Sequence, residues 1–270
     1  KFKFNEGLTP VMVKEGGSYI WGFIDKTVKM IIEPQFSYAS DFSEGLAVVV
    51  ITDKINPWNQ SVVFINKTGE IVIQAQFFNA HKFKEGLAAV KLKVPEDPSE
   101  KGSRWITIDK NGQSFVEKWG FIDKTGKIVI QPQFVEVDSF SEGLAKVAVF
   151  NNEGQQVWGF IDRTGKIVIN PQFADVKNFK NGLAAVSNWT TTKSRLTGSI
   201  YHHKSNFGFI DKTGKEVIPP KFSELCPKIV SDFCLTFNND LAFVVIDDNQ
   251  IGYINKKGEF IWSSSDKKSK

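Results

Sequence analysis

Short apolar runs separated by polar turns recur along the whole chain. In the segment that starts at Trp119, the apolar run WGFI leads into DKTG and then into a second apolar run, KIVI. Asp at the start of such a turn and Gly at its end favour a type I turn that closes a β-hairpin. The pattern therefore predicts two antiparallel strands, which we call B (the WG run) and C (the run after the turn).

A third apolar run, such as GLAVVV at residues 45–50, precedes the WG hairpin and is called strand A. Strand B places Trp21 and Phe23 on one face and Ile24 on the other, so the inner strands are expected to be buried on both faces. Pro-Gln-Phe ends strand C, because Pro has no N–H to donate to a ladder. The polar stretch that follows is expected to form a short outer strand beside strand C.

The unit recurs roughly every 40 residues, the sign of a repeat architecture. Units lie near residues 21–50, 62–91, 119–150, 158–187 and 207–246, while 1–13 and 251–263 read as complementary halves of a sixth. These segments predict one repeat domain over residues 1–263, followed by a disordered Lys/Ser-rich tail at 264–270.

The elements WGFIDKTGKIVI and F-x-x-GLA resemble the WG repeat, also called the KWG repeat, of bacterial proteins. The resemblance covers nearly the whole chain. It implies a β-rich interaction module that has no catalytic activity and no cofactor of its own.

Four short strands in about 40 residues are typical of a β-propeller blade. We therefore expect a six-bladed propeller, with an open β-solenoid of stacked hairpins as the alternative. Residues 1–6 are expected to close the ring by adding a strand to a last blade, whose strands A, B and C would be 241–246, 251–255 and 259–263.

The turn of the first unit departs from the pattern, because Val28 stands where the other units have Gly. A β-branched residue adopts a positive φ only at a cost. The sequence therefore predicts a strained or altered turn at Val28.

Composition supports an all-β chain, with 24 Phe against 4 Tyr and 2 Met. A net charge of only +4 argues against nucleic acid as a partner, and no apolar run is long enough for a membrane span. The two cysteines, Cys226 and Cys234, could form one bridge, although two buried free thiols are favoured. Since the chain begins at Lys1, an N-terminal segment is expected to be missing, and a cytoplasmic or extracytoplasmic location stays open.

Catalytic motifs are scarce. The chain has three histidines and lacks G-x-S-x-G, H-E-x-x-H and C-x-x-C, which disfavours hydrolytic triads and zinc sites. The segment GFIDKTGK at 120–127 differs from a phosphate-binding loop in its spacing and joins two strands. The recurrent Asp25, Asp123, Asp162 and Asp211 are interpreted as turn residues. We expect no enzyme, no cofactor and no metal.

The units differ mainly in insertions between strands A and B, at 52–61, 92–118, 151–156 and 188–206. WITIDKNGQSF at 105–115 is expected to be an extra hairpin. Because exposed Trp, Tyr and Arg often anchor interfaces, the predicted function is a protein-binding scaffold, with lectin-like carbohydrate binding as the alternative. The candidate binding residues are Trp58, Arg104, Trp105, Trp189, Arg195, Tyr201, His202 and His203.

Overall fold

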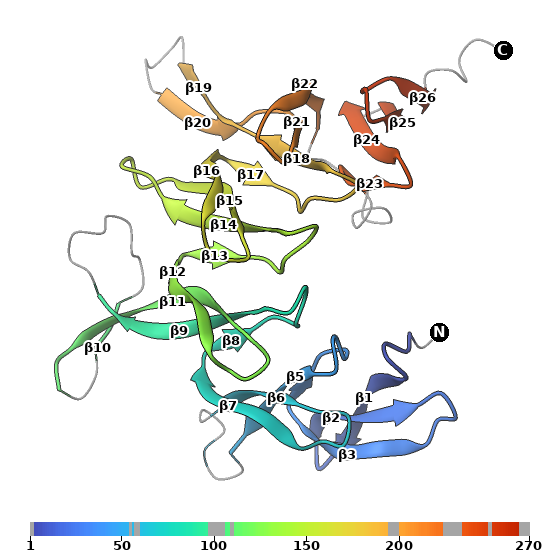
Figure 1. Ribbon diagram of the computed structural model, residues 1–270, viewed down its shortest axis with the longest axis vertical. Helices are drawn as coiled ribbons and strands as arrows, with labels where there is room; N and C mark the ends of the chain where they lie inside the picture. Colours follow the sequence, from blue (N-terminus) through green and yellow to red (C-terminus); the bar gives the residue numbers. More distant parts are fainter. Residues whose placement is uncertain are drawn as a thin grey trace. The chain divides into compact units, whose positions relative to one another are not determined.

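The computed structural model describes residues 3–53, 56, 60–96, 106–108, 111–193, 200–223, 234–247 and 250–264. These residues form β-strands and contain no α-helix, so the all-β prediction is confirmed (Figure 1). The chain divides into two compact units, Lys1–Phe140 and Ser141–Lys270, which are described separately. The tail at 265–270 lies outside the described residues.

The first unit contains three antiparallel sheets among its described residues. The first sheet consists of β1 (Leu8–Glu15), β2 (Ser18–Asp25) and β3 (Met30–Phe36). The second has β4 (Tyr38–Ala39), β5 (Ala47–Thr52), β6 (Gln60–Ile65) and β7 (Ile71–Phe77). The third has β8 (Asn79–Ala80), β9 (Ala88–Pro95), β11 (Ser114–Ile122), β12 (Ile128–Phe134) and, paired with β11, β10 (Thr107–Ile108). The short strand β13 (Glu136–Val137) ends the unit.

The second unit repeats the same plan. One sheet includes β14 (Leu144–Phe150), β15 (Gln156–Asp162) and β16 (Ile167–Phe173). The next has β17 (Asp175–Val176), β18 (Leu183–Ser187), β21 (Phe207–Asp211) and β22 (Glu216–Phe222), and an added hairpin pairs β19 (Trp189–Lys193) with β20 (Ile200–Lys204). The last has β23 (Phe237–Asn238), β24 (Leu241–Asp247), β25 (Gln250–Asn255) and β26 (Phe260–Ser263).

Strands A, B and C pair in the predicted order, but the short strand lies at the opposite edge from the one expected. In the second sheet the order is β4-β5-β6-β7, so the short strand β4 pairs with strand A and not with strand C. Tyr38 pairs with Val50 and Ala39 with Val49. The reason is local, because the polar stretch connects through a tight turn to strand A and forms a hairpin with it.

The N-terminal segment begins the first sheet. Asn5 bridges to Leu8 across a tight turn, and β1 then pairs with β2 along its full length. Strands β24, β25 and β26 confirm the assignment of the last sheet. Closure by residues 1–6 and the count of six blades stay predictions.

The Gly of the WG motif is required by a close approach of strand C. Trp21 pairs with Phe36 and Phe23 with Ile32, so strand C bulges over the intervening Gly22. A Cβ on Gly22 would lie 2.5 Å from the Ile32 carbonyl oxygen and 2.8 Å from the Pro34 nitrogen. Neighbouring Phe23 and Ile24 are both buried, which confirms that strand B is covered on both faces.

The turn at Val28 keeps the geometry of a glycine turn. Val28 has φ of +66°, and its N–H donates to the Asp25 carbonyl at 3.0 Å. Its side chain is exposed. The strain predicted from the sequence is therefore present, since a valine occupies the left-handed region.

The preference for free thiols was wrong. Cys234 is buried and disulfide-bonded. The chain's other cysteine, Cys226, lies outside the described residues. The two are close in sequence, so the loop that joins them closes at low entropic cost.

Candidate functional site

Neighbouring sheets are cross-linked at the end where strand A begins and strands B and C turn. In the first unit, Glu44 accepts a hydrogen bond from the Gly86 amide at 3.0 Å and pairs with Lys124 at 3.2 Å. Glu6 binds the Gly45 amide at 3.0 Å and Lys67 at 3.1 Å in the same way. We call this arrangement the glutamate clamp; its residues stabilise the stacking of the sheets.

The second unit has the same clamp at Glu142. Its carboxylate accepts from the Gly182 amide at 2.9 Å and lies 3.3 Å from the Lys212 ammonium. Burial raises the pKa of Glu142, but the Gly182 amide and Lys212 together lower it more, so the pKa lies below its ordinary value. The carboxylate is therefore ionised, and its oxygens interact with the Gly182 amide and the Lys212 ammonium.

The carboxylates of the recurrent turn aspartates also accept hydrogen bonds from neighbouring groups of the chain. Asp25 Oδ1 accepts from the Thr27 hydroxyl at 2.6 Å, the Thr27 amide at 2.8 Å and the Lys29 amide at 3.0 Å. The Thr27 hydroxyl bond is the main cause of the lowered pKa of Asp25. Equivalent bonds hold Asp123, Asp162 and Asp211. The turn interpretation of these residues is confirmed.

The insertions lie at the other end of the sheets, between strands A and B. Within each unit the clamps lie at the end of the sheets that carries the B–C turns, and the A–B connections lie at the opposite end. The insertion at 92–118 lengthens β9 and β11 and adds β10, where Thr107 pairs with Phe115 as expected for an extra hairpin. The insertion at 188–206 forms β19 and β20, a hairpin that the sequence did not reveal.

The structure describes only part of the predicted site. Trp58, Arg104, Trp105 and Arg195 lie outside the described residues. Tyr201, His202 and His203 lie on β20, where the side chain of His203 is exposed. His202 pairs with Thr191 and His203 with Thr190 in the hairpin register.

Trp189 folds back onto a neighbouring sheet. Its indole N–H donates to the Gln156 carbonyl of β15 at 3.3 Å, and its side chain is half-buried. Lys204, opposite Trp189 in the hairpin, pairs with Asp175 at 2.9 Å. These contacts fasten the base of the hairpin, so Trp189 contributes to its support.

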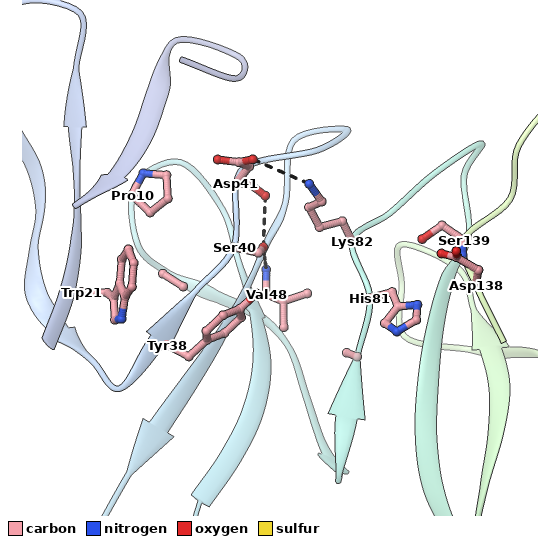
Figure 2. Close-up of a pocket in the computed structure, with 12 residues that line it drawn as sticks. Pro10, Trp21, Tyr38, Ser40, Asp41, Val48, His81, Lys82, Asp138 and Ser139 are labelled. Atoms are coloured by element: carbon pink, nitrogen blue, oxygen red, sulfur yellow. Dashed lines mark hydrogen bonds and ion pairs between the residues drawn. The ribbon is translucent and has the colours of Figure 1, made fainter. Parts of the chain in front are cut away.

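A hollow in the first unit was missed by the sequence argument. It has a volume of about 460 Å³, and its wall comes from the segments that follow the short strands β4, β8 and β13 (Figure 2). These segments contribute three pairs of polar residues: Ser40 and Asp41, His81 and Lys82, Asp138 and Ser139. Pro10, Trp21, Tyr38 and Val48 complete most of the lining.

The repeat register contains the signal that could have found this hollow. Each polar pair directly precedes a buried Phe, namely Phe42, Phe83 or Phe140. The hollow is therefore lined by the same two positions of successive repeats. The signal went unused because the polar stretch was expected to form an outer strand on the far edge of the sheet.

No group of three or more His, Cys, Asp or Glu side chains is arranged to hold a metal ion among the residues that the structure describes. The described residues also contain no helix whose length and apolarity would suit a membrane crossing.

Comparisons with known sequences identify the repeat. The profile of a family described as "WG containing repeat" matches residues 21–54, 64–93, 119–152, 158–188 and 207–227, just over half of the chain. A search of curated proteins found no significant match.

Comparisons with solved structures support the fold. A structure described as a eukaryotic initiation factor is similar over 98% of this chain and 64% of its own, with 12% identity and a TM-score of 0.53. BamB from Moraxella catarrhalis is similar over 97% and 72%, with 9% identity and a TM-score of 0.46. The initiation-factor structure is a β-propeller protein, so the predicted all-β, propeller-type class is confirmed. This chain spans less than two thirds of the initiation-factor structure.

Proposed function

The chain belongs to the WG-containing repeat family, and we propose that it is a non-enzymatic scaffold that binds a protein partner through its A–B connections. The observation that carries the proposal is the difference between the two ends of the sheets. At one end, the glutamate clamp and the B–C turns recur with similar structure, and their polar side chains form hydrogen bonds and ion pairs within the chain. At the other end, the A–B connections vary in length and in sequence.

Exposed apolar side chains at these connections support a protein partner. In the β1–β2 hairpin, Met12 pairs with Trp21 and Tyr19 pairs with Lys14. The side chains of Met12 and Tyr19 are 52% and 57% exposed. Ile106 and Ile108 are likewise exposed at β10, in the insertion of the third sheet. Met and Tyr are enriched in the cores of protein interfaces.

The added hairpin of the second unit offers a further surface of this kind. Strands β19 and β20 form a two-stranded sheet by themselves, so each has a ladder edge without a strand partner among the described residues. The base is closed by Asn188 and Ser205, whose main chains bond at 2.8 Å. The hairpin can therefore be removed while β18 and β21 keep their pairing.

The test uses the immobilised full chain to capture proteins, each of which is then purified and titrated by calorimetry. One variant carries Met12→Ser and Tyr19→Ser, and a second replaces residues 189–204 by a Gly-Gly link. The matched control carries Val129→Ser and Val168→Ser, which are exposed on β12 and β16.

We expect at least one purified protein whose Kd rises about tenfold or more in one of the first two variants and stays unchanged in the control, a loss of roughly 1.4 kcal/mol or more. The proposal fails if no purified protein binds the chain, or if all three variants bind it equally well.

A further inference from the structure

The hollow of the first unit has the features of a small-ligand site that is separate from the A–B connections. All its lining residues belong to the first unit. Its volume of about 460 Å³ lies within the range of ligand pockets. We propose that this hollow binds a saccharide, a function independent of the protein-binding scaffold.

The apolar part of the lining suits the C–H face of a sugar ring. Val48, Ala39 and Ala80 are buried in the wall, while Trp21 is half-buried and Tyr38 is 51% exposed. Figure 2 shows both aromatic rings on the same side of the hollow. A ring with a polar tip can stack on an apolar surface and also form a hydrogen bond.

The polar part supplies both donors and acceptors. Asp41 and Asp138 provide carboxylate oxygens, and Lys82 provides an ammonium group that lies 3.7 Å from Asp41. A sugar hydroxyl both donates and accepts, so it can use each of these groups. A strongly charged ligand would meet a like charge in the same hollow, which favours a neutral polyhydroxylated one.

Part of the wall is fixed before any ligand binds. The Ser40 hydroxyl accepts from the Val48 amide at 3.0 Å and donates to the Asp41 carbonyl at 3.1 Å. The His81 ring packs on Trp119 with centroids 4.7 Å apart. Such fixed groups reduce the ordering cost of binding.

The test measures saccharide binding by the full chain with saturation-transfer difference NMR and calorimetry. The probes are glucose, galactose, mannose, N-acetylglucosamine and their β1,4-linked disaccharides. Sodium phosphate and arginine methyl ester are the charged probes. The variants are Tyr38→Ala and Asp41→Asn.

Two control substitutions match these variants in chemistry but lie outside the hollow. Phe78→Ala removes an equally exposed aromatic ring of the first unit. Asp240→Asn removes a carboxylate that pairs with Lys256 at 2.6 Å in the second unit.

We expect at least one saccharide to bind with saturable transfer to its ring C–H protons. Its Kd should rise at least about tenfold in Tyr38→Ala and in Asp41→Asn, and should stay unchanged in both controls. The inference is overturned if none of the saccharides binds, if only a charged probe binds, or if the hollow variants and the controls behave alike. None of these outcomes depends on whether a protein partner is found.

Discussion

At the scale of single residues, the first and last residues of the turns between strands B and C vary together. Where Asp begins the turn, Lys ends it; where Asn66 or Asn255 begins it, Glu70 or Glu259 ends it. The amide groups of Asn66 and Asn255 donate to these glutamates at 2.7 Å. Asn66 Oδ1 accepts the same three bonds as Asp25 Oδ1, whereas Asn255 Oδ1 accepts two amide bonds because Lys257 has no hydroxyl group. Both kinds of turn could be predicted from the sequence.

Val28 provides a test of the backbone requirement. We expect Val28→Gly to raise the melting temperature, because the relief of about 1–2 kcal/mol of left-handed strain exceeds the roughly 0.5–1 kcal/mol lost through the greater freedom of Gly when unfolded. Thermal unfolding followed by circular dichroism measures the change.

The reciprocal substitution is Gly126→Val. Gly126 has φ of +86°, and a Cβ there would lie 3.0 Å from the Ile73 side chain of the preceding sheet. This variant should melt well below the parent chain. A lower melting temperature for Val28→Gly as well would show that the turn at Val28 gains nothing from a glycine.

At the scale of strands and sheets, the polar short strands explain what the sequence could and could not predict. Strands A, B and C follow from apolar runs, and Leu241–Asp247 was placed almost to the residue. Tyr38–Ala39 was assigned to the wrong edge, because two residues carry too little pattern to specify a pairing partner. The hollow beside them was missed for the same reason.

The clamp at Glu142 is expected to stabilise the docking of one sheet on the next. Glu142→Ala removes a carboxylate bonded to the Gly182 amide and Lys212 and should cost about 2 kcal/mol of unfolding free energy. Glu142→Gln keeps an acceptor for the amide and should cost about half as much. Urea unfolding measures both.

The control is Glu216→Ala, at an exposed position on β22 outside the clamp, which should change the free energy by less than about 0.5 kcal/mol. Both Glu142 variants retain a side chain at φ of +55°, so the backbone cost is common to them. Equal losses of unfolding free energy for Glu142→Gln and Glu142→Ala would contradict a stabilising role for the hydrogen bond from the Gly182 amide.

At the scale of the whole molecule, the two units are built from the same type of repeat but differ in whether a disulfide bond stabilises them. The disulfide of Cys234 belongs to the second unit alone. The sequence favoured free thiols, because free cysteines are often buried and two cysteines eight residues apart do not by themselves show that a bridge forms. The family and the all-β class, by contrast, follow from the repeated WG and GLA motifs.

Reduction should therefore affect the units differently. Opening a loop of this length removes about 2.5 kcal/mol of stabilisation in the chain-entropy description. We expect dithiothreitol to speed amide hydrogen exchange in β24 and β25 and to leave β5 and β6 unchanged, as measured by mass spectrometry. Equal acceleration in both units, or none in β24, would contradict this expectation.

The close approach at the WG glycine also constrains the design of new repeat arrays. The second sheet has Val63 where the motif has Gly and Ala75 where strand C has Pro, and there Val63 pairs directly with Gln74. The register still shifts between Val62 and Val63, so the bulge is retained there without Gly or Pro. The last sheet has Gly252 but Ser264 at the position of Pro, and a Cβ on Gly252 would lie 2.7 Å from the Trp262 carbonyl oxygen. A consensus array should therefore choose the two positions separately, and it needs Gly wherever the backbone of strand C approaches strand B as closely as it does at Gly22 and Gly252.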